Sequence, residues 1–354
     1  MLKLDASHGE GGGQVLRTAL ALSVALRRPV ALSGIRARRP KPGLQPQHLT
    51  AVRALATISD AQVSGDALDS TELTFAPRAV RGGDYRFDVG AIRGSAGSVS
   101  LLVQALLLPL ALAREPSHLR LVGGTHAPWS PPVHYLSGVL LPALEHVGLD
   151  AEVTLHRWGW YPRGGGEVEV RIEPGDPGVS WRGLRWETPP SRPGVLGISA
   201  VSRLPREIAE RQRRQALTRL HSRGLVADIA LVEDTQALDR GTFLFLSVSA
   251  AGAHAGFSAL GRRGVTAEAV ADEAVDALVA YLDSSAAVDD HLADQLVPYL
   301  ALAGGPSVFT CPSPSHHLRT VVWTVQQFVG ARIEIADGHP TRIAIAPEIP
   351  PAPG

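Results

Sequence analysis

The residues with the clearest chemical potential begin in a glycine-rich segment, Gly9-Glu10-Gly11-Gly12-Gly13-Gln14. It follows a short predicted strand and precedes an apolar stretch, Val15 to Ala25, that predicts a helix. The backbone N–H groups of such a loop, together with the helix N-terminus, can bind an anion. Glu10 could hold a divalent cation beside a polyphosphate, and Arg17 would face the same side one turn into the helix. A purely structural turn explains the glycines equally well.

A basic segment, residues 36–41, contains four cations in six positions. Its proline, and those that follow, keep the chain extended, so that neighbouring side chains fan out instead of pairing on a helix. Guanidinium groups bind phosphate oxygens through two parallel hydrogen bonds. The basic segment therefore suits recognition of a phosphodiester, with a solvated loop of arginines as the alternative.

A candidate nucleophile stands late in the chain, in Ser313-Pro-Ser-His316-His317, where His317 opens a predicted helix. Imidazole can attack phosphorus and pass the resulting labile adduct onward, although a lone histidine is more often structural. Before it, Asp294 and Gln295 could hydrogen-bond a ribose or a base, or belong to an acidic first turn that favours the helix dipole. Gln104 is the one polar residue of a strongly apolar predicted helix, where it either caps a backbone group or contacts a ligand.

The elements that must position these residues form a weak repeat. His48, His134 and His317 each open an amphipathic helix that leads into a strand, a turn and a second strand. The spacings are 86 and 183 residues, and the excess of 97 in the second is the size of a small domain. We expect an α+β fold, an α/β sandwich, in which three repeated βαβαββ-like units form a large core.

The domain limits follow from composition. A proline-rich segment from Thr188 to Pro193 opens a stretch that predicts a charged helix and two further strands. We therefore place an inserted small α+β domain at residues 181–265. The core is then discontinuous, comprising residues 1–180 and 266–345, and residues 346–354 are expected to be a flexible tail.

Composition excludes several classes of protein. The 34 basic and 34 acidic side chains among 354 residues cancel, although residues 1–53 contain nine basic and two acidic ones, which predicts a local basic face. Only Lys3 and Lys41 are lysines, so neither a Gly-Lys-Ser/Thr phosphate loop nor a lysine nucleophile motif is present. A single cysteine, Cys311, excludes an intrachain disulfide and a multi-cysteine zinc site. The most apolar stretch, Leu101 to Ala113, is too short to span a bilayer, and we expect a cytoplasmic protein without membrane association.

Five motifs in order carry a resemblance: Gly-Glu-Gly-Gly-Gly-Gln, Arg-x-x-Arg-x-Lys-Pro-Gly-Leu, Arg81-Gly-Gly-Asp-Tyr-Arg-Phe, Leu-Ala-Asp-Gln and Ser-His-His-Leu. Over nearly its whole length the chain resembles the RNA 3′-terminal phosphate cyclase family. The resemblance implies an ATP-dependent enzyme of the nucleotidyltransferase or ligase type. In that reaction a histidine takes AMP from ATP, the AMP moves to an RNA 3′-phosphate, and the neighbouring 2′-hydroxyl closes a 2′,3′-cyclic phosphate. AMP and pyrophosphate are released.

The same resemblance assigns roles to residues. The family's nucleophile falls on His317, beside His316, and its metal-binding glutamate falls on Glu10, for Mg²⁺ or Mn²⁺. The implied nucleotide-binding positions are Gln104 and the segment His291, Leu292, Ala293, Asp294 and Gln295, where the family often has an aromatic residue in place of His291. The implied contacts to RNA or the triphosphate are Arg17, Arg36, Arg39, Gln47 and His48.

Three other functions remain open at this stage. A ribosome-assembly factor shares the family's sequence but lacks the nucleophilic histidine, which is present here. A module that binds RNA ends with ATP as a structural ligand would need neither Glu10 nor His317. An enolpyruvate-type transferase also has a fold of repeated units, but without a covalent histidine intermediate. The sequence predicts ATP and an RNA with a 3′-terminal phosphate as partners, and no oligomeric state.

Overall fold

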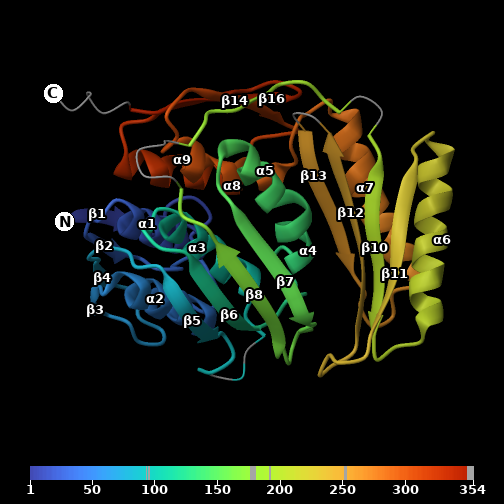
Figure 1. Cartoon of the computed structure of the whole chain (residues 1–354), viewed down its shortest axis with the longest axis horizontal. Coiled ribbons are helices and arrows are strands. Elements are labelled where there is room, and N and C mark those ends of the chain that lie inside the picture. The colour runs from blue at the N-terminus through green and yellow to red at the C-terminus, as the bar shows by residue number, and fades with distance from the viewer. Residues whose placement is uncertain (93, 95, 176–180, 191–192, 251–252, 349–354) are drawn as a thin grey trace.

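The structure is a computed structural model that describes residues 1–92, 94, 96–175, 181–190, 193–250 and 253–348. Helices and strands are interspersed along the chain, and the described strands form four sheets of four strands each (Figure 1). Three of the sheets belong to a larger core and the fourth belongs to a smaller lobe (Figure 1). This confirms the α+β class expected from the sequence.

The first repeat follows the order strand, helix, strand, helix, strand, strand. Strands β1 and β2 are parallel because α1 returns the chain to the same edge, and β2 pairs with β4 and β4 with β3 in antiparallel fashion. The sheet order is β1-β2-β4-β3. The elements are β1 (Leu2–Asp5), α1 (Gln14–Ala25), β2 (Val30–Ser33), α2 (Pro46–Ser59), β3 (Gln62–Ser64) and β4 (Leu73–Ala76).

The second and third repeats have the same strand order as the first. Their sheets run β5-β6-β8-β7 and β9-β14-β16-β15, again with one parallel pair and two antiparallel pairs. The second repeat contains β5 (Gly83–Asp88), α3 (Val99–Ala111), β6 (Ser117–Gly123), α4 (Val133–Tyr135), the π-helical turn η1 (Leu136–Leu140), α5 (Leu141–Val147), β7 (Ala151–Arg157) and β8 (Gly166–Ile172). The third contains β9 (Arg185–Trp186), α8 (Asp290–Leu300), β14 (Ser307–Cys311), α9 (His316–Phe328), β15 (Arg332–Ala336) and β16 (Thr341–Ala346).

The helices of the three repeats pack against one another between the sheets (Figure 1). Helix α1 contacts α2, α3 and α9, and α8 contacts α3 and α9. Helix α3 is apolar on nearly every face, as expected for a helix that is covered on all sides. The side chain of Ser98 caps it by accepting a hydrogen bond from the backbone N–H of Leu101 at 3.3 Å. The first helices of the three repeats therefore meet in the interior of the core.

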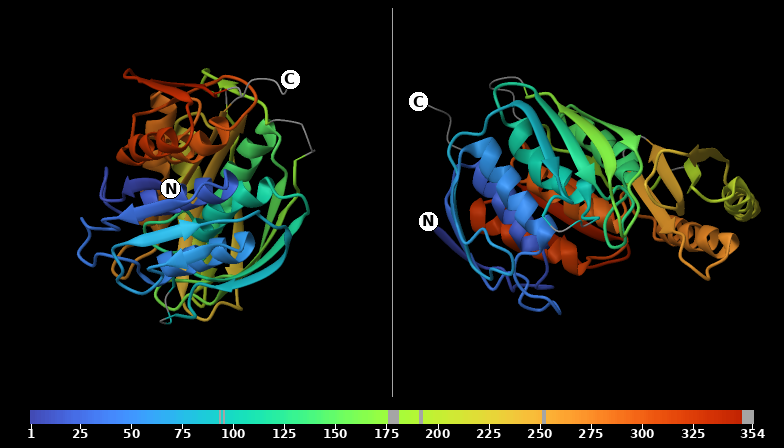
Figure 2. Two further views of the ribbon diagram at one scale, coloured as in Figure 1. Left: turned by 90° about the vertical axis from the view of Figure 1, so that its left-hand side faces the viewer. Right: turned by 90° about the horizontal axis from the view of Figure 1, so that it is seen from below.

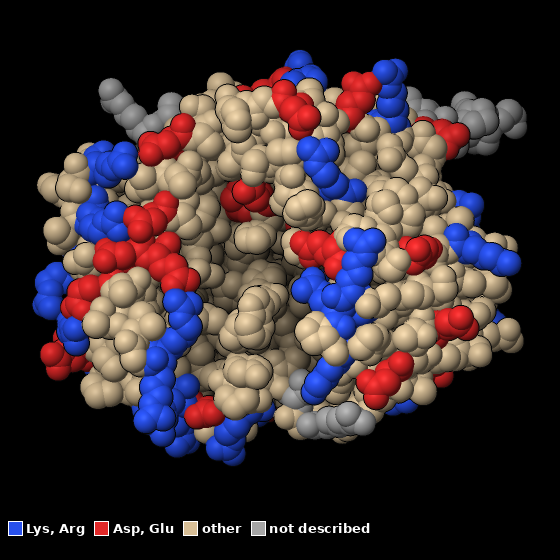
Figure 3. Space-filling view, turned by 180° about the vertical axis from the view of Figure 1, so that it is seen from behind, with Lys and Arg blue, Asp and Glu red and all other residues tan. Residues whose placement is uncertain are grey.

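The smaller lobe is inserted into the third repeat, between β9 and α8, and stands at the side of the core (Figure 2). Its sheet order is β11-β10-β12-β13, and α6 and α7 pack on that sheet and on each other around a separate apolar cluster. On the opposite side from the view of Figure 1, the surface is hollowed and has lysine and arginine side chains along its borders (Figure 3). The lobe comprises β10 (Val195–Ser202), α6 (Arg206–Ser222), β11 (Ala227–Asp234), β12 (Gly241–Ala250), β13 (Ala253–Leu260) and α7 (Ala267–Asp283).

The limits of the lobe differ from the expected 181–265. Strand β9, at Arg185–Trp186, pairs with β14 of the core, so the chain enters the lobe only after it. Helix α7 packs on β12, β13 and α6, so the lobe extends to Asp283. The proline-rich segment lies between β9 and β10, although its residues 191–192, like most of the expected tail, fall outside the described residues.

No helix in the described part of the chain is both long and apolar enough to cross a membrane. The most apolar one, α3, ends at Ala111 after 13 residues.

Candidate active site

The glycine-rich loop between β1 and α1 lies against basic side chains. Gly9 and Gly11 have positive φ angles of 63° and 58°, a backbone conformation that favours glycine. A Cβ atom on Gly13 would lie 2.4 Å from His48 Nε2 and 2.9 Å from Arg17 Nη1. The lack of side chains therefore lets the loop backbone touch these cationic and imidazole groups immediately before α1 begins.

Glu10, in this loop, lies between two basic side chains. Its Oε2 atom is 3.2 Å from Arg39 Nη2 and 3.3 Å from His317 Nε2. Three segments that are far apart in the sequence meet at this carboxylate: the glycine-rich loop, the basic segment and the start of α9. The structure thus places the expected metal ligand directly beside the expected nucleophile.

His317 is in the first turn of α9, and the segment that leads into this turn is held by hydrogen bonds on both sides. Ser315 Oγ caps α9 by accepting a hydrogen bond from the backbone N–H of Leu318 at 3.0 Å. Asp290 Oδ1, at the start of α8, accepts a hydrogen bond from the backbone N–H of Ser313 at 3.1 Å. These contacts fix the start of α9 relative to α8.

The surroundings of His317 keep its imidazole neutral near pH 7. Partial burial is the main cause that lowers the pKa of His317, because the charged form loses hydration. The positive charges of Arg17 and Arg39, together with His291, lower the pKa further, and only Glu10 opposes them. A neutral imidazole has a free lone pair on one ring nitrogen, which is the requirement for a nucleophile.

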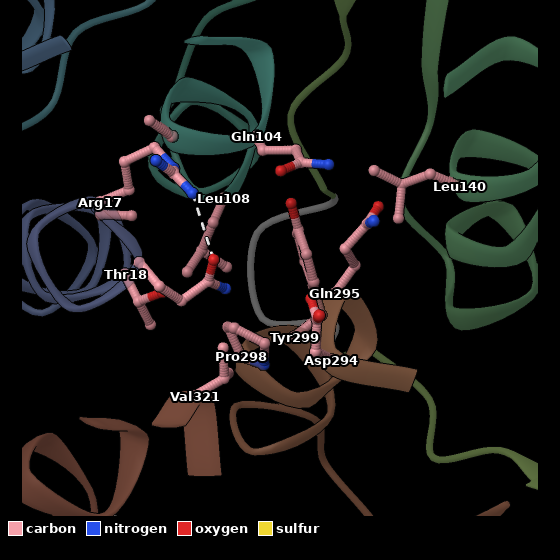
Figure 4. A pocket seen from close by; sticks show the side chains of 13 residues that line it. Arg17, Thr18, Gln104, Leu108, Leu140, Asp294, Gln295, Pro298, Tyr299 and Val321 are labelled. Atoms are coloured by element: carbon pink, nitrogen blue, oxygen red, sulfur yellow. Dashed lines mark hydrogen bonds between the residues drawn. The ribbon is translucent and has the colours of Figure 1, made fainter. Parts of the chain in front are cut away.

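Arg17 on α1 and Asp294 on α8 form a polar pair that lines one pocket, and each affects the pKa of the other. Burial lowers the pKa of Arg17 to about 10, and the negative charge of Asp294 acts in the opposite direction. Burial also raises the pKa of Asp294 well above its ordinary value, with further contributions from Asp289 and Glu10, while Arg17 counteracts them. Arg17 donates a hydrogen bond from Nη2 to Gln14 Oε1 at 3.1 Å, drawn as the dashed line in Figure 4.

A pocket of about 520 Å³, part of it open to solvent, adjoins this pair (Figure 4). Two of its buried amide atoms, Gln104 Nε2 and Gln295 Oε1, have no hydrogen-bond partner among the described residues. Unpaired buried polar atoms are costly, and they are common where a ligand supplies the missing partner. The lining residues are Gln14, Arg17, Thr18, Ala21, Gln104, Ala105, Leu108, Leu140, Asp294, Gln295, Pro298, Tyr299 and Val321.

His48, at the start of α2, lies against the glycine-rich loop, and Gln47 precedes it in the same helix. His48 is buried, and within the part of the chain that the structure describes its Nδ1 atom has no hydrogen-bond partner. Burial lowers its pKa to about 3, with Arg17 and Arg36 adding to the effect. Gln47 Oε1 accepts a hydrogen bond from the backbone N–H of Ser98 at 3.4 Å, at the N-terminus of α3. The two side chains therefore extend the polar surface from His317 towards the second repeat.

Arg36, Leu292 and Ala293, which the resemblance implies as ligand contacts, have side chains that are partly or wholly engaged within the protein. Arg36 donates hydrogen bonds from Nη1 to the carbonyl oxygens of Lys41 and Gly43, at 2.5 and 3.0 Å, so part of its guanidinium closes its own loop. The side chains of Leu292 and Ala293 are fully buried in the apolar core. These two residues can offer a ligand only their backbone atoms.

Asp289, one residue before α8, has a structural role that the sequence does not reveal. Tyr135 donates a hydrogen bond from its hydroxyl to both carboxylate oxygens of Asp289, at 2.9 and 3.0 Å. The backbone N–H groups of Gly256, His291 and Leu292 donate to the same carboxylate at 2.8–2.9 Å. Asp289 therefore joins α8 to the second repeat and to the inserted lobe, and the signal in the sequence was its place one residue before the helix.

Comparison with known proteins gives one consistent result. The sequence profile of the family described as "RNA 3'-terminal phosphate cyclase" matches residues 8–335. Proteins named RNA 3'-terminal phosphate cyclase are similar to this chain: one from Gloeothece citriformis is 43% identical, covering 95% of each chain, and one from Methylococcus capsulatus is 45% identical, covering 95% of this chain and 93% of the relative. A third, from Archaeoglobus fulgidus, is 41% identical, covering 93% of this chain and 96% of the relative. Among solved structures, the enolpyruvyl transferase NikO from Streptomyces tendae matches 49% of this chain and 32% of its own, at 17% identity and a TM-score of 0.27.

Proposed function

Because the chain belongs to the RNA 3′-terminal phosphate cyclase family, we propose that it is an ATP-dependent enzyme that converts an RNA 3′-phosphate into a 2′,3′-cyclic phosphate. The observation that carries this proposal is the pair formed by Glu10 and His317, whose Oε2 and Nε2 atoms are 3.3 Å apart. A half-exposed, neutral imidazole beside a glycine-rich anion loop and two arginines is suited to attack a phosphate ester.

In the first step, a ring nitrogen of His317 donates its lone pair to the α-phosphorus of ATP. A nitrogen–phosphorus bond forms, the bond to the β-phosphate oxygen breaks, and pyrophosphate leaves with the electron pair. The lowered pKa of His317, caused mainly by burial, keeps the attacking form populated near pH 7. Arg17 and Arg39 are close enough to affect that pKa, so they are also placed to neutralise charge that builds on the phosphate oxygens.

The donor set fits a divalent cation only in part. No cluster of three or more histidine, cysteine or acidic side chains that could hold a metal ion occurs in the described residues. Mg²⁺ is commonly bound by one or two carboxylates together with substrate phosphates, and Glu10 offers one such carboxylate at the anion loop. A Mg²⁺ or Mn²⁺ ion bound by Glu10 and the triphosphate would supply charge stabilisation for the leaving pyrophosphate.

The pocket beside Asp294 is the site that we propose for the nucleoside part of ATP. Gln104 Nε2 and Gln295 Oε1 offer one unpaired donor and one unpaired acceptor, as the edge of a base requires. Asp294 is positioned within hydrogen-bonding reach of the same pocket, which it lines. Binding there would pair buried polar atoms that the protein alone leaves without partners.

The remaining steps use the RNA. An oxygen of the RNA 3′-phosphate attacks the phosphorus of the histidine adduct, the nitrogen–phosphorus bond breaks, and its electron pair returns to His317. The terminal 2′-hydroxyl then attacks the 3′-phosphorus, AMP leaves with the bonding electrons, and the hydroxyl proton passes to solvent. Cyclisation is intramolecular, so activation of the phosphate is most of the chemical problem. We propose the basic segment, with Arg39, and the adjoining Gln47 as the surface that receives the RNA end, with buried His48 supporting it from behind.

The test is self-adenylation with ATP labelled at the α-phosphate, in the presence of Mg²⁺ or Mn²⁺. Wild-type protein should acquire an acid-labile label, and an RNA with a 3′-phosphate should remove it while forming a cyclic end. His317→Ala should remain unlabelled. His316→Ala is the matched control, because the neighbouring imidazole is exposed and should not be needed.

Two outcomes would contradict the proposal. Equal loss of label in both histidine variants would mean that His317 is not the attacking group. Absence of label on the wild-type protein, with RNA ends still bound, would favour a non-catalytic RNA-binding function on the same fold.

A further inference from the structure

Trp129 is the most exposed large apolar residue among those that the structure describes, with 94% of its surface accessible. Of the other tryptophans, Trp158, Trp160, Trp181 and Trp186 are all less than 8% exposed, and Trp323 stacks on His8 at a ring distance of 3.9 Å. No aromatic pair that involves Trp129 occurs within the described part of the chain. Its indole ring therefore contributes almost nothing to the core.

The backbone at Trp129 is held in an unfavourable conformation. Its φ angle is +61°, in the left-handed region that is unfavourable for an L-residue with a bulky side chain. The loop is nonetheless fixed: Ser130 Oγ donates to the carbonyl of Ala127 at 3.0 Å, and the backbone N–H of Val133 donates to the carbonyl of Thr125 at 3.1 Å. The surrounding loop thus holds a large apolar ring in solvent, and strain of this kind is concentrated at binding sites.

The loop that carries Trp129 begins at Gly124, beside the surface that we propose for the RNA terminus. The backbone N–H of Gly124 donates to the carbonyl of Gly97 at 2.8 Å. A Cβ atom on Gly97 would in turn lie 2.9 Å from Gln47 Cβ. The chain that leads to Trp129 therefore starts against Gln47, next to His48 and the glycine-rich loop.

The second end leads to the nucleotide pocket. Trp129 is followed by α4, in which Tyr135 donates to Asp289 at the start of α8. The next element, η1, ends at Leu140, which lines the pocket and is labelled in Figure 4. The loop that carries Trp129 thus connects the two halves of the candidate site.

The loop between β7 and β8 lies alongside and adds a second exposed ring. His126 forms a bridge with Trp160, and its backbone N–H donates to the carbonyl of Gly159 at 3.1 Å. Tyr161, the next residue, is 58% exposed. Two aromatic side chains therefore stand in solvent on adjoining loops near one end of the site.

We propose that Trp129 is a stacking platform for a base near the 3′ end of the RNA substrate, an inference that rests on the function proposed above. Single-stranded nucleic acids are commonly held by stacking of unpaired bases on aromatic side chains. Because every base has a π-face, such a contact tolerates different sequences, as an enzyme that acts on RNA ends requires. Trp129 is then a positioning residue that orients the terminal phosphate towards His317.

The test combines Trp129 variants with RNA that lacks single bases. Trp129→Ala should raise KM for an RNA 3′-phosphate by about 5- to 150-fold, the range expected for loss of one stacked base, and Trp129→Phe should retain most of the affinity. Substrates with an abasic nucleotide at the last, second-last or third-last position should identify the stacked base. At the position whose base stacks on Trp129, combining the abasic substitution with Trp129→Ala should raise KM no further than either change alone. Val226→Ala, at another exposed apolar residue (81% exposed), is the control and should leave KM unchanged.

A second measurement needs no turnover. Acrylamide should quench the fluorescence of Trp129 strongly, since the ring is exposed, and a bound RNA oligonucleotide should protect it; the quenchable component should be absent in Trp129→Phe. Protection without any self-adenylation would reject the proposed function and leave the stacking platform standing. Normal cyclisation with an unchanged KM in Trp129→Ala, or additive effects at all three positions, would overturn the platform alone. A change in molar mass of Trp129→Ala without a change in RNA affinity would assign the ring to a protein interface instead.

Discussion

The protonation state of His317 provides the sharpest test of the site, because two neighbouring charges should change it in opposite directions. We expect Glu10→Gln to weaken the affinity of the imidazole for its proton, since the variant removes the one nearby negative charge that raises the pKa of His317. We expect Arg39→Gln to strengthen that affinity, because it removes a positive charge that lowers the pKa. Glu10→Gln preserves the length of the side chain, whereas Arg39→Gln shortens it and also removes its contact with Glu10.

The size of the Glu10 effect follows from the geometry. Two unit charges separated by 3.3 Å, the distance between Glu10 Oε2 and His317 Nε2, attract by about 1.3 kcal/mol in bulk water. The dielectric constant of water gives the smallest effect, because the two side chains are only 26% and 43% exposed. That energy corresponds to a change of about tenfold in proton affinity. Less complete screening by solvent would make the change larger.

The assay is an NMR titration of the histidine rings in protein free of ATP and metal ions. The chain has 13 histidines, and the resonance of His317 is identified by its absence in His317→Ala. Omission of the metal matters, because Glu10 is also the proposed metal ligand and the electrostatic effect must be measured alone. If both variants shift the titration of His317 in the same direction, or neither shifts it, the charges around this imidazole do not set its state and the reasoning is refuted.

Three further predictions concern stability and loop geometry. Tyr135→Phe removes the hydroxyl that donates to both oxygens of Asp289. It should lower the free energy of unfolding, measured in urea, by about 1.5–3 kcal/mol, and an unchanged midpoint would contradict this. Burial lowers the pKa of His48 to about 3 and that of His134 to about 4, so between these values and about pH 6.5 only the unfolded chain takes up their protons. Each histidine should therefore remove about 2 kcal/mol of stability on acidification from pH 7 to pH 5. A melting temperature that does not fall over this range would be inconsistent with neutral buried rings. Gly13→Ala would place a Cβ atom 2.4 Å from the Nε2 atom of buried His48. It should therefore slow self-adenylation and lower the melting temperature, whereas full activity would show that the loop has room.

The sequence predicted the repeated part of the fold because its signals are local. Each of the histidine-led segments has apolar residues at helical spacing followed by alternating strands, and the structure has α2, α4 with α5, and α9 in those places. The limits of the inserted lobe could not be predicted in this way. Strand β9 consists of Arg185–Trp186 and exists only because it pairs with β14, more than a hundred residues later in the chain. No local pattern marks a strand of two residues.

The candidate site was likewise predictable only as far as local sequence signals reach. The residues alone gave Glu10 an anion loop and His317 a possible nucleophilic role, but they gave no reason to bring the two together. Their contact depends on the packing of α1 against α9, which is a property of the assembled repeats. Resemblance to a family grouped these residues, and the structure shows the distances. Nothing in the sequence marked Trp129 as functional, because solvent exposure and a positive φ angle are visible only in three dimensions.

The three repeats offer the same histidine position three times, and their surroundings decide which one can react. His48 is buried, with a pKa of about 3 because of burial, and it is enclosed by the glycine-rich loop. His134 is also buried, and its Nδ1 atom lies 3.1 Å from His126 Nε2 in a hydrogen bond that occupies one ring nitrogen. Only His317 is both partly exposed and adjacent to a carboxylate, that of Glu10. Repetition of the unit thus supplies three similar helix starts. The packing around them is asymmetric, because the glycine-rich loop of the first repeat lies against the third, and this leaves one imidazole accessible to a phosphate.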